Sequence, residues 1–296
     1  MLDLRRLRLL RELAHRGTLA AVAEALSYSP STVSQQLSQL ESEVGVPLLE
    51  PVGRRVRLTA AAQILVAHTE QILEHLERAQ ADVAASAAEV VGLVRVAAFQ
   101  TAALTLVPPA IARLAERHPR LVVHLCQAEP EQALPALLAR DFDLVVAEEY
   151  PDSPQPRPRG VETTDLLDDP IRLALPRTVR TSRGPGALGR LAAHPWVMEP
   201  AGTASRAWAV GLCRSAGFEP DVRYESSDLL LHTRLVEAGH AAALLPDLVW
   251  AGGRPTVAVR PLPGAPAHRR IYTAVRAGHA GHPAIRALRA ALRPRD

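Results

Sequence analysis

Apolar residues recur with helical spacing along the first sixty positions, in three separate stripes. Each stripe follows the i, i+3, i+4, i+7 pattern that gives an α-helix one apolar face. The stripes are Leu4, Leu7, Leu10 and Ala14; Leu19, Val22, Ala23 and Leu26; and Val33, Leu37, Leu40 and Val44. Gly17 and Gly45 follow the first and third stripes, where a glycine commonly ends a helix. The pattern therefore predicts three short helices.

The break between the second and third predicted helices is short. Residues 27–29 form a turn, after which Pro30 takes the first helical position with Ser29 as its N-cap. Thr18 is placed to cap the second helix in the same way. Two short helices joined by a tight turn predict a helix-turn-helix unit.

The third predicted helix carries a polar stripe as well as an apolar one. Ser31, Ser34, Gln35 and Ser38 share one face, about 200° from the apolar stripe by helix geometry. Short hydroxyls and an amide suit the donors and acceptors of base edges in the major groove. An ordinary solvated face is the alternative, although such faces are usually richer in Glu and Arg. The stripe favours contact with DNA.

A small basic hairpin is expected after the third helix. Residues 47–59 contain two short apolar strands with Gly53 at the tip between them. The hairpin carries three guanidinium groups, those of Arg54, Arg55 and Arg57. Taken alone, such a cluster is often solvated surface, but beside a helix-turn-helix it predicts a wing that contacts phosphates or a minor groove.

The segment from Leu4 through Thr59 resembles the DNA-binding domain of the LysR-type transcriptional regulators. The runs that carry the resemblance are Ala23-Glu24-Ala25-Leu26, Ser29-Pro30-Ser31-Thr32-Val33-Ser34-Gln35-Gln36-Leu37, Leu40-Glu41 and Gly45-Val46-Pro47-Leu48-Leu49. It implies that the start of the third helix lies at the DNA and that the wing extends the contact. The candidate DNA-binding residues are Thr18, Ser29, Pro30, Ser31, Thr32, Ser34, Gln35, Ser38, Arg54, Arg55 and Arg57.

Three positions depart from that family's pattern. Leu49 stands where the family usually has Phe, and Pro51 and Gln35 stand where it often has Arg. One expected phosphate or minor-groove contact is therefore missing, and affinity is expected to depend more heavily on the wing arginines.

Residues 59–88 contain no Gly and no Pro and predict one long helix. Its apolar positions alternate spacings of four and three, the a/d pattern of a coiled coil. They are Leu65, Thr69, Ile72, Leu76, Ala79 and Val83. A helix packed on its own domain is the alternative. The LysR family has such a linker helix, so periodicity and resemblance both predict a homodimer or homotetramer.

Strands alternate with helices from Gly92 onward, which predicts an α/β domain with a parallel sheet. Strands are expected at 93–99, 121–126, 142–147, 171–175, 196–199, 222–224, 242–245 and 270–275. Helices are expected at 103–118, 131–139 and 283–292, with others starting near Thr203 and Ser227. This layout resembles the two-lobed, periplasmic-binding-protein-like (type 2) effector domain of the LysR family.

The whole chain is accordingly expected to be an α/β multidomain protein with three parts. Residues 1–58 form the winged helix-turn-helix domain, 59–89 the linker and dimerisation helix, and 90–296 the effector-binding domain. Lobe I of that domain is expected at about 90–161 and 268–296, and lobe II at about 162–267.

Three junctions between a strand and the following helix predict an effector site between the lobes. Ligands of open α/β sheets lie beyond the carboxyl ends of the strands, where helix N-termini meet. The candidates are Phe99, Gln100, Thr101, Gln127, Thr203, Ser205, Arg206, Ser226 and Ser227, with Glu129 a weaker one. Simple helix capping is the alternative for any single hydroxyl. The predicted ligand is a small polar metabolite, with or without a carboxylate.

Composition narrows the class of protein without deciding it. All 34 basic residues are Arg, the formal net charge is +3, and only 3% of residues are aromatic. No Gly-x-Ser-x-Gly elbow, phosphate-binding loop or His-Glu-x-x-His motif occurs, so neither an enzyme nor a cofactor is expected. The two cysteines and the absence of a signal peptide or a long apolar run predict a cytoplasmic protein without membrane contact.

These observations predict a sequence-specific regulator that binds double-stranded DNA and a small-molecule effector, with RNA polymerase as a further partner. An architectural DNA-binding protein is one alternative, although it does not need some two hundred residues of cleft-forming α/β structure. A redox-responsive regulator is another, and it requires Cys126 and Cys213 to meet across the lobes.

Overall fold

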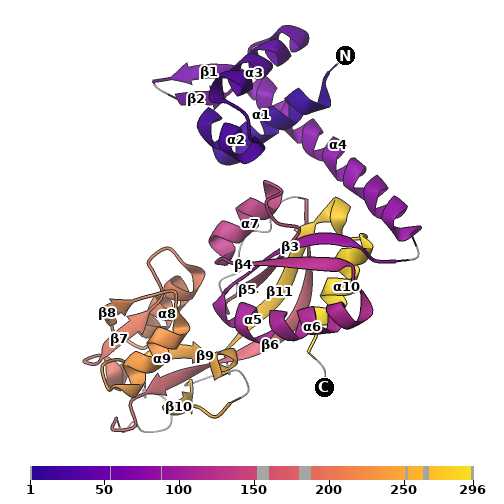
Figure 1. Cartoon of the computed structure of the whole chain (residues 1–296). Helices are drawn as coiled ribbons and strands as arrows, with labels where there is room; N and C mark the ends of the chain where they lie inside the picture. The colour runs from indigo at the N-terminus through magenta and orange to yellow at the C-terminus, as the bar shows by residue number, and fades with distance from the viewer. Residues whose placement is uncertain are drawn as a thin grey trace.

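The computed structural model describes residues 2–53, 55–87, 89–151, 160–179, 188–250, 253–262 and 267–294. A small N-terminal domain lies at one end of a long helix, α4 (Ala60–Ala85), and a two-lobed α/β domain lies at the other (Figure 1). Among these residues, no helix is long and apolar enough to cross a bilayer.

The N-terminal domain is a winged helix-turn-helix. Helices α1 (Leu4–Arg16), α2 (Leu19–Leu26) and α3 (Pro30–Val44) pack around a common apolar core, and strands β1 (Leu49–Val52) and β2 (Arg55–Leu58) form the antiparallel wing. The expected caps are in place, because the Thr18 and Ser29 hydroxyls accept bonds from backbone N–H groups of α2 and α3. Gly53 at the wing tip has a φ of 61°, a conformation that favours glycine.

Helix α4 has one face packed on its own chain and another face exposed. Ala62, Thr69, Leu73, Glu77 and Ala81 are buried, and the helix contacts α1 at one end and the short helix η3 (Ala277–His279) at the other. Large apolar side chains remain exposed on the same helix, namely Ile64, Ile72, Leu76 and Val83. Thr69, expected in a dimer seam, instead bonds the carbonyl of Leu65 and is fully buried within its own chain.

Lobe I is built on strands β3 (Gly92–Ala98), β4 (Leu121–Gln127), β5 (Leu144–Glu149) and β11 (His268–Arg276). Helices α5 (Gln100–Thr105), α6 (Val107–Arg117), α7 (Pro130–Leu138) and α10 (Pro283–Leu292) cover its faces. Strand β3 pairs in parallel with β4 and β5, whereas β11 runs antiparallel to β5. The sheet is therefore mixed, and the expectation of a wholly parallel sheet was wrong.

Lobe II contains β7 (Pro195–Met198), β8 (Asp221–Glu225), β9 (Ala243–Pro246) and β10 (Ala258–Pro261), with helices α8 (Ala204–Ser215) and α9 (Leu229–Glu237). The fifteen-residue strand β6 (Val161–Leu175) joins the lobes, because its first part pairs with β11 and its second with β9 and β10. The sequence predicted only 171–175 as strand, since polar residues fill the first part of β6.

The helix expected at 103–118 is two helices in the structure. Helix α5 ends at Thr105 and α6 begins at Val107, just before the pair Pro108-Pro109. Proline disfavours a helical conformation for the residue before it and lacks an N–H, so the break falls here. Helix α5 also starts earlier than expected, at Gln100. Gln100 and Thr101 therefore lie in its first turn.

Glycine allows a close approach between α4 and lobe I. A Cβ on Gly278 would overlap the backbone carbonyl of Glu74, so the two segments must separate to admit a side chain. We expect Gly278→Ala to lower the free energy of unfolding by about 1–3 kcal/mol, the usual cost of overpacking. Gly281→Ala is a matched control, because its Cβ would meet nothing within 4 Å. Chemical denaturation of both variants measures the difference, and equal stabilities would show that α4 does not dock here.

Candidate DNA-binding face and effector cleft

The polar stripe of α3 forms an exposed face of the DNA-binding domain. Ser31, Ser34, Gln35 and Ser38 are all exposed, whereas Val33, Leu37 and Leu40 are buried on the opposite side. Ser31 and Thr32 bond the hydroxyl of Ser29 at 2.8 Å, so these two hydroxyls lie at the helix N-cap. Side chains further along the stripe point away from the core, as direct contact with base edges requires.

The wing carries its own counter-charge. Arg57 Nε donates to Glu50 Oε1 at 2.9 Å across the hairpin, and both side chains are well exposed. Exposed ion pairs of this kind are weak, so a phosphate can replace the carboxylate as the partner of Arg57. Arg55 begins β2, and Arg54 lies outside the described residues.

A buried arginine lies where the two lobes meet. Arg269 on β11 is fully buried and bonds Glu148 from β5, Asp169 from β6 and the Thr101 hydroxyl from α5. Its guanidinium also lies 5.0 Å from the centre of the Phe99 ring. The negative charges around this group raise the pKa of Arg269 further despite burial, so it is permanently charged. Phe99 and Thr101, both predicted as effector residues, therefore contact Arg269.

Two further carboxylates, those of Glu199 and Glu129, lie in the same region, and among the described residues neither forms an ion pair with an arginine. Burial, together with the charges of Glu148 and Glu129, raises the pKa of Glu199 to about 8. Burial, with the charges of Glu148 and Glu131, raises the pKa of Glu129 to about 7. The edge between the lobes is thus rich in acid, and a proton or a bound cation stabilises it.

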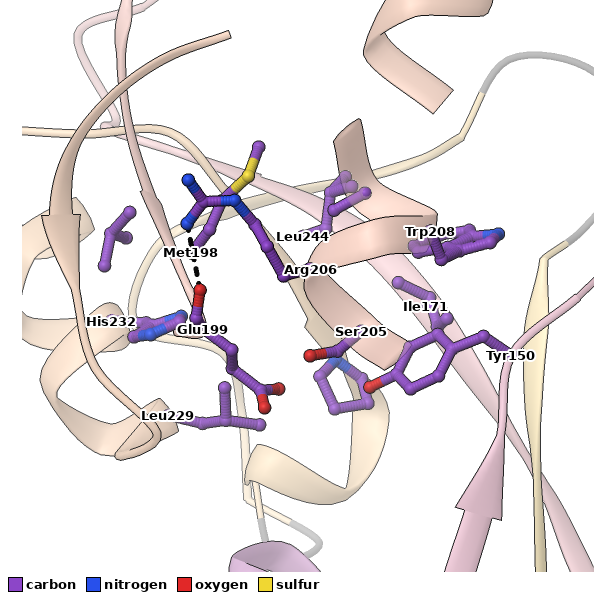
Figure 2. Close-up of a pocket in the computed structure, with 13 residues that line it drawn as sticks. Tyr150, Ile171, Met198, Glu199, Ser205, Arg206, Trp208, Leu229, His232 and Leu244 are labelled. Atoms are coloured by element: carbon purple, nitrogen blue, oxygen red, sulfur yellow. Dashed lines mark hydrogen bonds between the residues drawn. The ribbon is translucent and has the colours of Figure 1, made fainter. Parts of the chain in front are cut away.

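A small cavity of about 30 Å³ lies at the edge of lobe II, beside Glu199. Figure 2 shows the Glu199 carboxylate and the hydroxyls of Ser205 and Tyr150 converging on one space, with Trp208 on the Tyr150 side. The rings of Tyr150 and Trp208 are 5.5 Å apart. The full lining is Tyr150, Ile171, Val197, Met198, Glu199, Ser205, Arg206, Trp208, Ala209, Leu229, His232, Leu244 and Pro246. This volume accepts one small polar group.

Two side chains of lobe I occupy the helix N-termini of lobe II. Gln100 Oε1 accepts from the backbone N–H of Leu229 at 2.7 Å, and its Nε2 donates to Asp228 at 2.5 Å, both at the start of α9. Glu131 accepts from the backbone N–H of Ala204 at 2.8 Å, at the start of α8. The sequence-based hypothesis used these helix ends for an anionic ligand, whereas the structure uses them to join the lobes.

The other predicted effector residues have various local roles, and one of them, Thr203, caps a helix. Thr203 caps α8 and bonds Ser205 at 3.1 Å, and the Ser226 hydroxyl accepts from the backbone N–H of Asp228 at 3.0 Å. Gln127 and Ser227 are exposed outside the cavity. Arg206 lines the cavity, but its guanidinium donates to the carbonyl of Glu199 and pairs with Glu225.

Of the nine effector residues predicted from sequence, only Ser205 and Arg206 line the cavity. Tyr150, Glu199, Trp208 and His232 were missed, and so was the Arg269 cluster behind them. An acidic residue at the end of a buried strand, as with Glu148 in β5 and Glu199 just after β7, was the signal available in the sequence.

The cysteines and the possible metal-binding side chains give little support to a redox-sensing or metal-binding role. Cys126 is exposed on β4, while Cys213 is buried in α8, where burial raises the pKa of its thiol to about 12. A thiol of high pKa is a poor nucleophile, so Cys213 is poorly suited to sensing oxidants. Within the described residues, no group of three or more His, Cys, Asp or Glu side chains is arranged to hold a metal ion.

Two family models match the chain and together span almost all of it. The model described as "Bacterial regulatory helix-turn-helix protein, lysR family" matches residues 4–63. The model described as "LysR substrate binding domain" matches residues 87–296, well over half of the chain. The first covers the face built on α3 and the wing, and the second covers both lobes and the cleft.

Curated relatives match most of the length of the chain. The chain is 27% identical over 259 residues to the transcriptional dual regulator GltC of Bacillus subtilis, covering 88% of this chain and 85% of that protein. It is 27% identical over 248 residues to the DNA-binding transcriptional dual regulator OxyR of Escherichia coli, covering 83% and 80%.

Solved structures of full-length proteins have the same architecture. A full-length OxyR variant from Pseudomonas aeruginosa superposes with a TM-score of 0.70 at 22% identity, covering 99% of this chain and 95% of that one. Full-length CbnR in complex with its target DNA superposes with a TM-score of 0.54 at 25% identity, covering 98% of both chains.

Proposed function

The chain belongs to the LysR family of transcriptional regulators, and from this premise we propose how its face, helix and cleft divide the work of regulation. It is a DNA-binding transcriptional regulator with an effector-binding domain, which sets aside the catalytic alternative. The observation that carries the proposal is the exposed polar stripe of α3 beside the wing. A cytoplasmic location and RNA polymerase as a partner belong to the same proposal.

On this proposal, α3 enters the major groove and the wing contacts the backbone. Ser34, Gln35 and Ser38 supply base contacts, because they are exposed hydroxyl and amide groups with no charge among them. Thr18, Ser29, Pro30, Ser31 and Thr32 lie at helix N-termini, where backbone N–H groups favour phosphates. Arg54, Arg55 and Arg57 contact phosphates or a minor groove.

Dimerisation belongs to the exposed side of α4. Ile72 and Leu76 are 43% and 41% exposed, and Val83 is 72% exposed, on a helix whose other face is already packed. Apolar side chains in a row on a long helix are best covered by the same row of a second copy. A dimer then places two copies of α3 on one duplex, so we propose an inverted repeat as its target.

The effector site lies at the Glu199 edge of the cleft, and we propose a ligand whose positively charged amine enters the small cavity there. Carboxylates of Glu199, Glu129 and Glu148 surround the region. The nearby Arg269 is bonded to Glu148 and Asp169, and Arg206 on the lining is paired with Glu225. Aromatic rings such as those of Tyr150 and Trp208 attract cations. This replaces the carboxylate-bearing ligand expected from the sequence.

Recognition is tested on duplexes that the wild-type chain selects from a random library. We expect Gln35→Ala to lose about 1–3 kcal/mol of binding free energy on selected DNA and little on unrelated DNA, because it removes a base contact. Arg57→Ala is expected to weaken both alike and to reduce the salt dependence. Gln132→Ala and Arg223→Ala, at exposed positions of the effector domain, are the matched controls. Equal loss on both DNAs for Gln35→Ala would contradict the assignment.

Assembly is tested by changing Ile72 and Leu76 together to Asp. Charges in an apolar seam cannot be buried without partners, so the double variant should sediment as a monomer and bind DNA weakly. Gln71 and His75, exposed on the same helix with the same spacing, give the control pair when both are changed to Asp. An unchanged mass for the Ile72 and Leu76 variant would show that α4 does not pair through this face.

Ligand class is tested by thermal unfolding with putrescine and succinate, a diamine and a dicarboxylate of equal carbon number. The pKa values of Glu199 and Glu129 are raised in the folded state, so the free protein should lose stability as pH rises from about 4.5 toward 8. Putrescine should raise the melting temperature more at pH 8.5 than at pH 6, because it binds the ionised carboxylates. Glu199→Gln should flatten the pH dependence and lose the putrescine shift.

Stabilisation by succinate without stabilisation by putrescine would overturn this ligand class. Ser227→Ala is the control variant, because Ser227 is exposed outside the cavity and should respond as the wild type does.

A further inference from the structure

The turn that follows α7 is held by the DNA-binding domain of the same chain. Arg11 on α1 is buried, and its guanidinium donates to the carbonyl of Leu138. Arg16, one turn further along α1, donates to Asp141 at 2.6 Å. In Figure 1, α7 lies on the side of lobe I that faces the N-terminal helices. The contact joins segments more than 120 residues apart in the sequence.

The same turn is held from a second side by α4. Glu77 on α4 is buried and accepts bonds from Arg140 in the turn and from Arg276 Nε, the latter at 2.7 Å. Arg276 also donates to the carbonyls of Leu137 at 3.0 Å and Phe142 at 2.5 Å. Arg140 has a φ of 68°, an uncommon conformation for a residue other than glycine, and it persists because these bonds hold both sides of the turn.

The other end of α7 lies at the cleft. Glu131, in its first turn, bonds the backbone N–H of Ala204 in lobe II at 2.8 Å. Ala133 and Leu137 of α7 are buried against lobe I. Nine residues of helix span about 13 Å, so one short helix contacts lobe II at its start and the DNA-binding domain at its end.

We propose that the turn 138–142 is a docking surface for the DNA-binding domain of the same chain, and that α7 couples this docking to the contact between the lobes. The coupling half rests on the effector cleft proposed above. A change in lobe separation acts on Glu131, α7 moves with it, and the turn presents its carbonyls and Asp141 to α1 in a different position. Packed elements of this kind shift between discrete arrangements, which gives a small displacement a large effect.

Hydrogen exchange of the full chain, without DNA or ligand, tests the docking. Asp141→Arg places a second positive charge against Arg16, so amides of α1 and of the turn should exchange several-fold faster than in the wild type. Glu219→Arg is the control, because Glu219 forms an exposed ion pair of 2.7 Å with Arg214 in lobe II and the charge change is identical. Unchanged exchange of α10 reports that lobe I stays folded.

The same measurement on Glu131→Ala tests the coupling. Loss of the bond to Ala204 should speed exchange at the turn and in α1, although Glu131 touches neither. Glu116→Ala, at an exposed position of α6, is the control. Wild-type exchange of α1 in either Asp141→Arg or Glu131→Ala would overturn the proposal. Because neither DNA nor effector is present, failure of the DNA or ligand experiments above leaves this result independent of them.

Discussion

Buried arginines constrain how the parts of this protein can be arranged. A guanidinium has five N–H donors and keeps its charge, so burying one is costly unless acceptors surround it. Arg11, Arg269 and Arg276 are 1%, 1% and 6% exposed. Each donates hydrogen bonds to acceptors on elements other than its own. Arg11 joins α1 to lobe I, Arg276 joins lobe I to α4, and Arg269 joins three strands and α5 where the lobes meet. Removing an acceptor leaves a buried guanidinium with fewer partners, so each of these contacts favours the arrangement of the elements that it joins.

The sequence predicted the helices well and the charge networks hardly at all, for one physical reason. Helical periodicity is local, so the stripes of α1, α2 and α3, their caps and the ends of α10 follow from neighbours within a few residues. The partners of Arg11 and Arg276 lie up to 199 residues away, and no spacing rule connects them. Strand β6 was underestimated for a related reason. Its first part is polar and partly exposed, and its strand conformation depends on pairing with β11, a segment about one hundred residues later.

The cleft shows how a sound local rule and the folded structure can point to different ligands. The Thr203 hydroxyl does cap α8, although the cap of α9 is the carboxylate of Asp228, and helix N-termini do favour negative charge. In the folded chain, however, Glu131 supplies the negative charge at α8, and Gln100 with Asp228 satisfies the first N–H groups of α9. The charge that is least neutralised at the cleft is negative rather than positive. Burial, together with the charge of Glu148, raises the pKa values of Glu199 and Glu129. The chemistry of the site therefore follows from what the protein has not already neutralised.

On the effector site and the coupling proposed above, protons, ligand and lobe contact act on a single equilibrium. Gln100 and Glu131 hold the lobes together through bonds made only when the lobes meet, whereas repulsion among Glu129, Glu148 and Glu199 opposes that contact. Neutralising a carboxylate favours the closed arrangement, whether the neutralising group is a proton or an amine. A ligand shifts this balance only by its difference in affinity for the two arrangements, typically about 1–3 kcal/mol of coupling. The segment at the end of α7 bonds Arg11 and Arg16 of the DNA-binding domain. A coupling free energy of that size at the cleft is therefore sufficient to alter how firmly that domain is held.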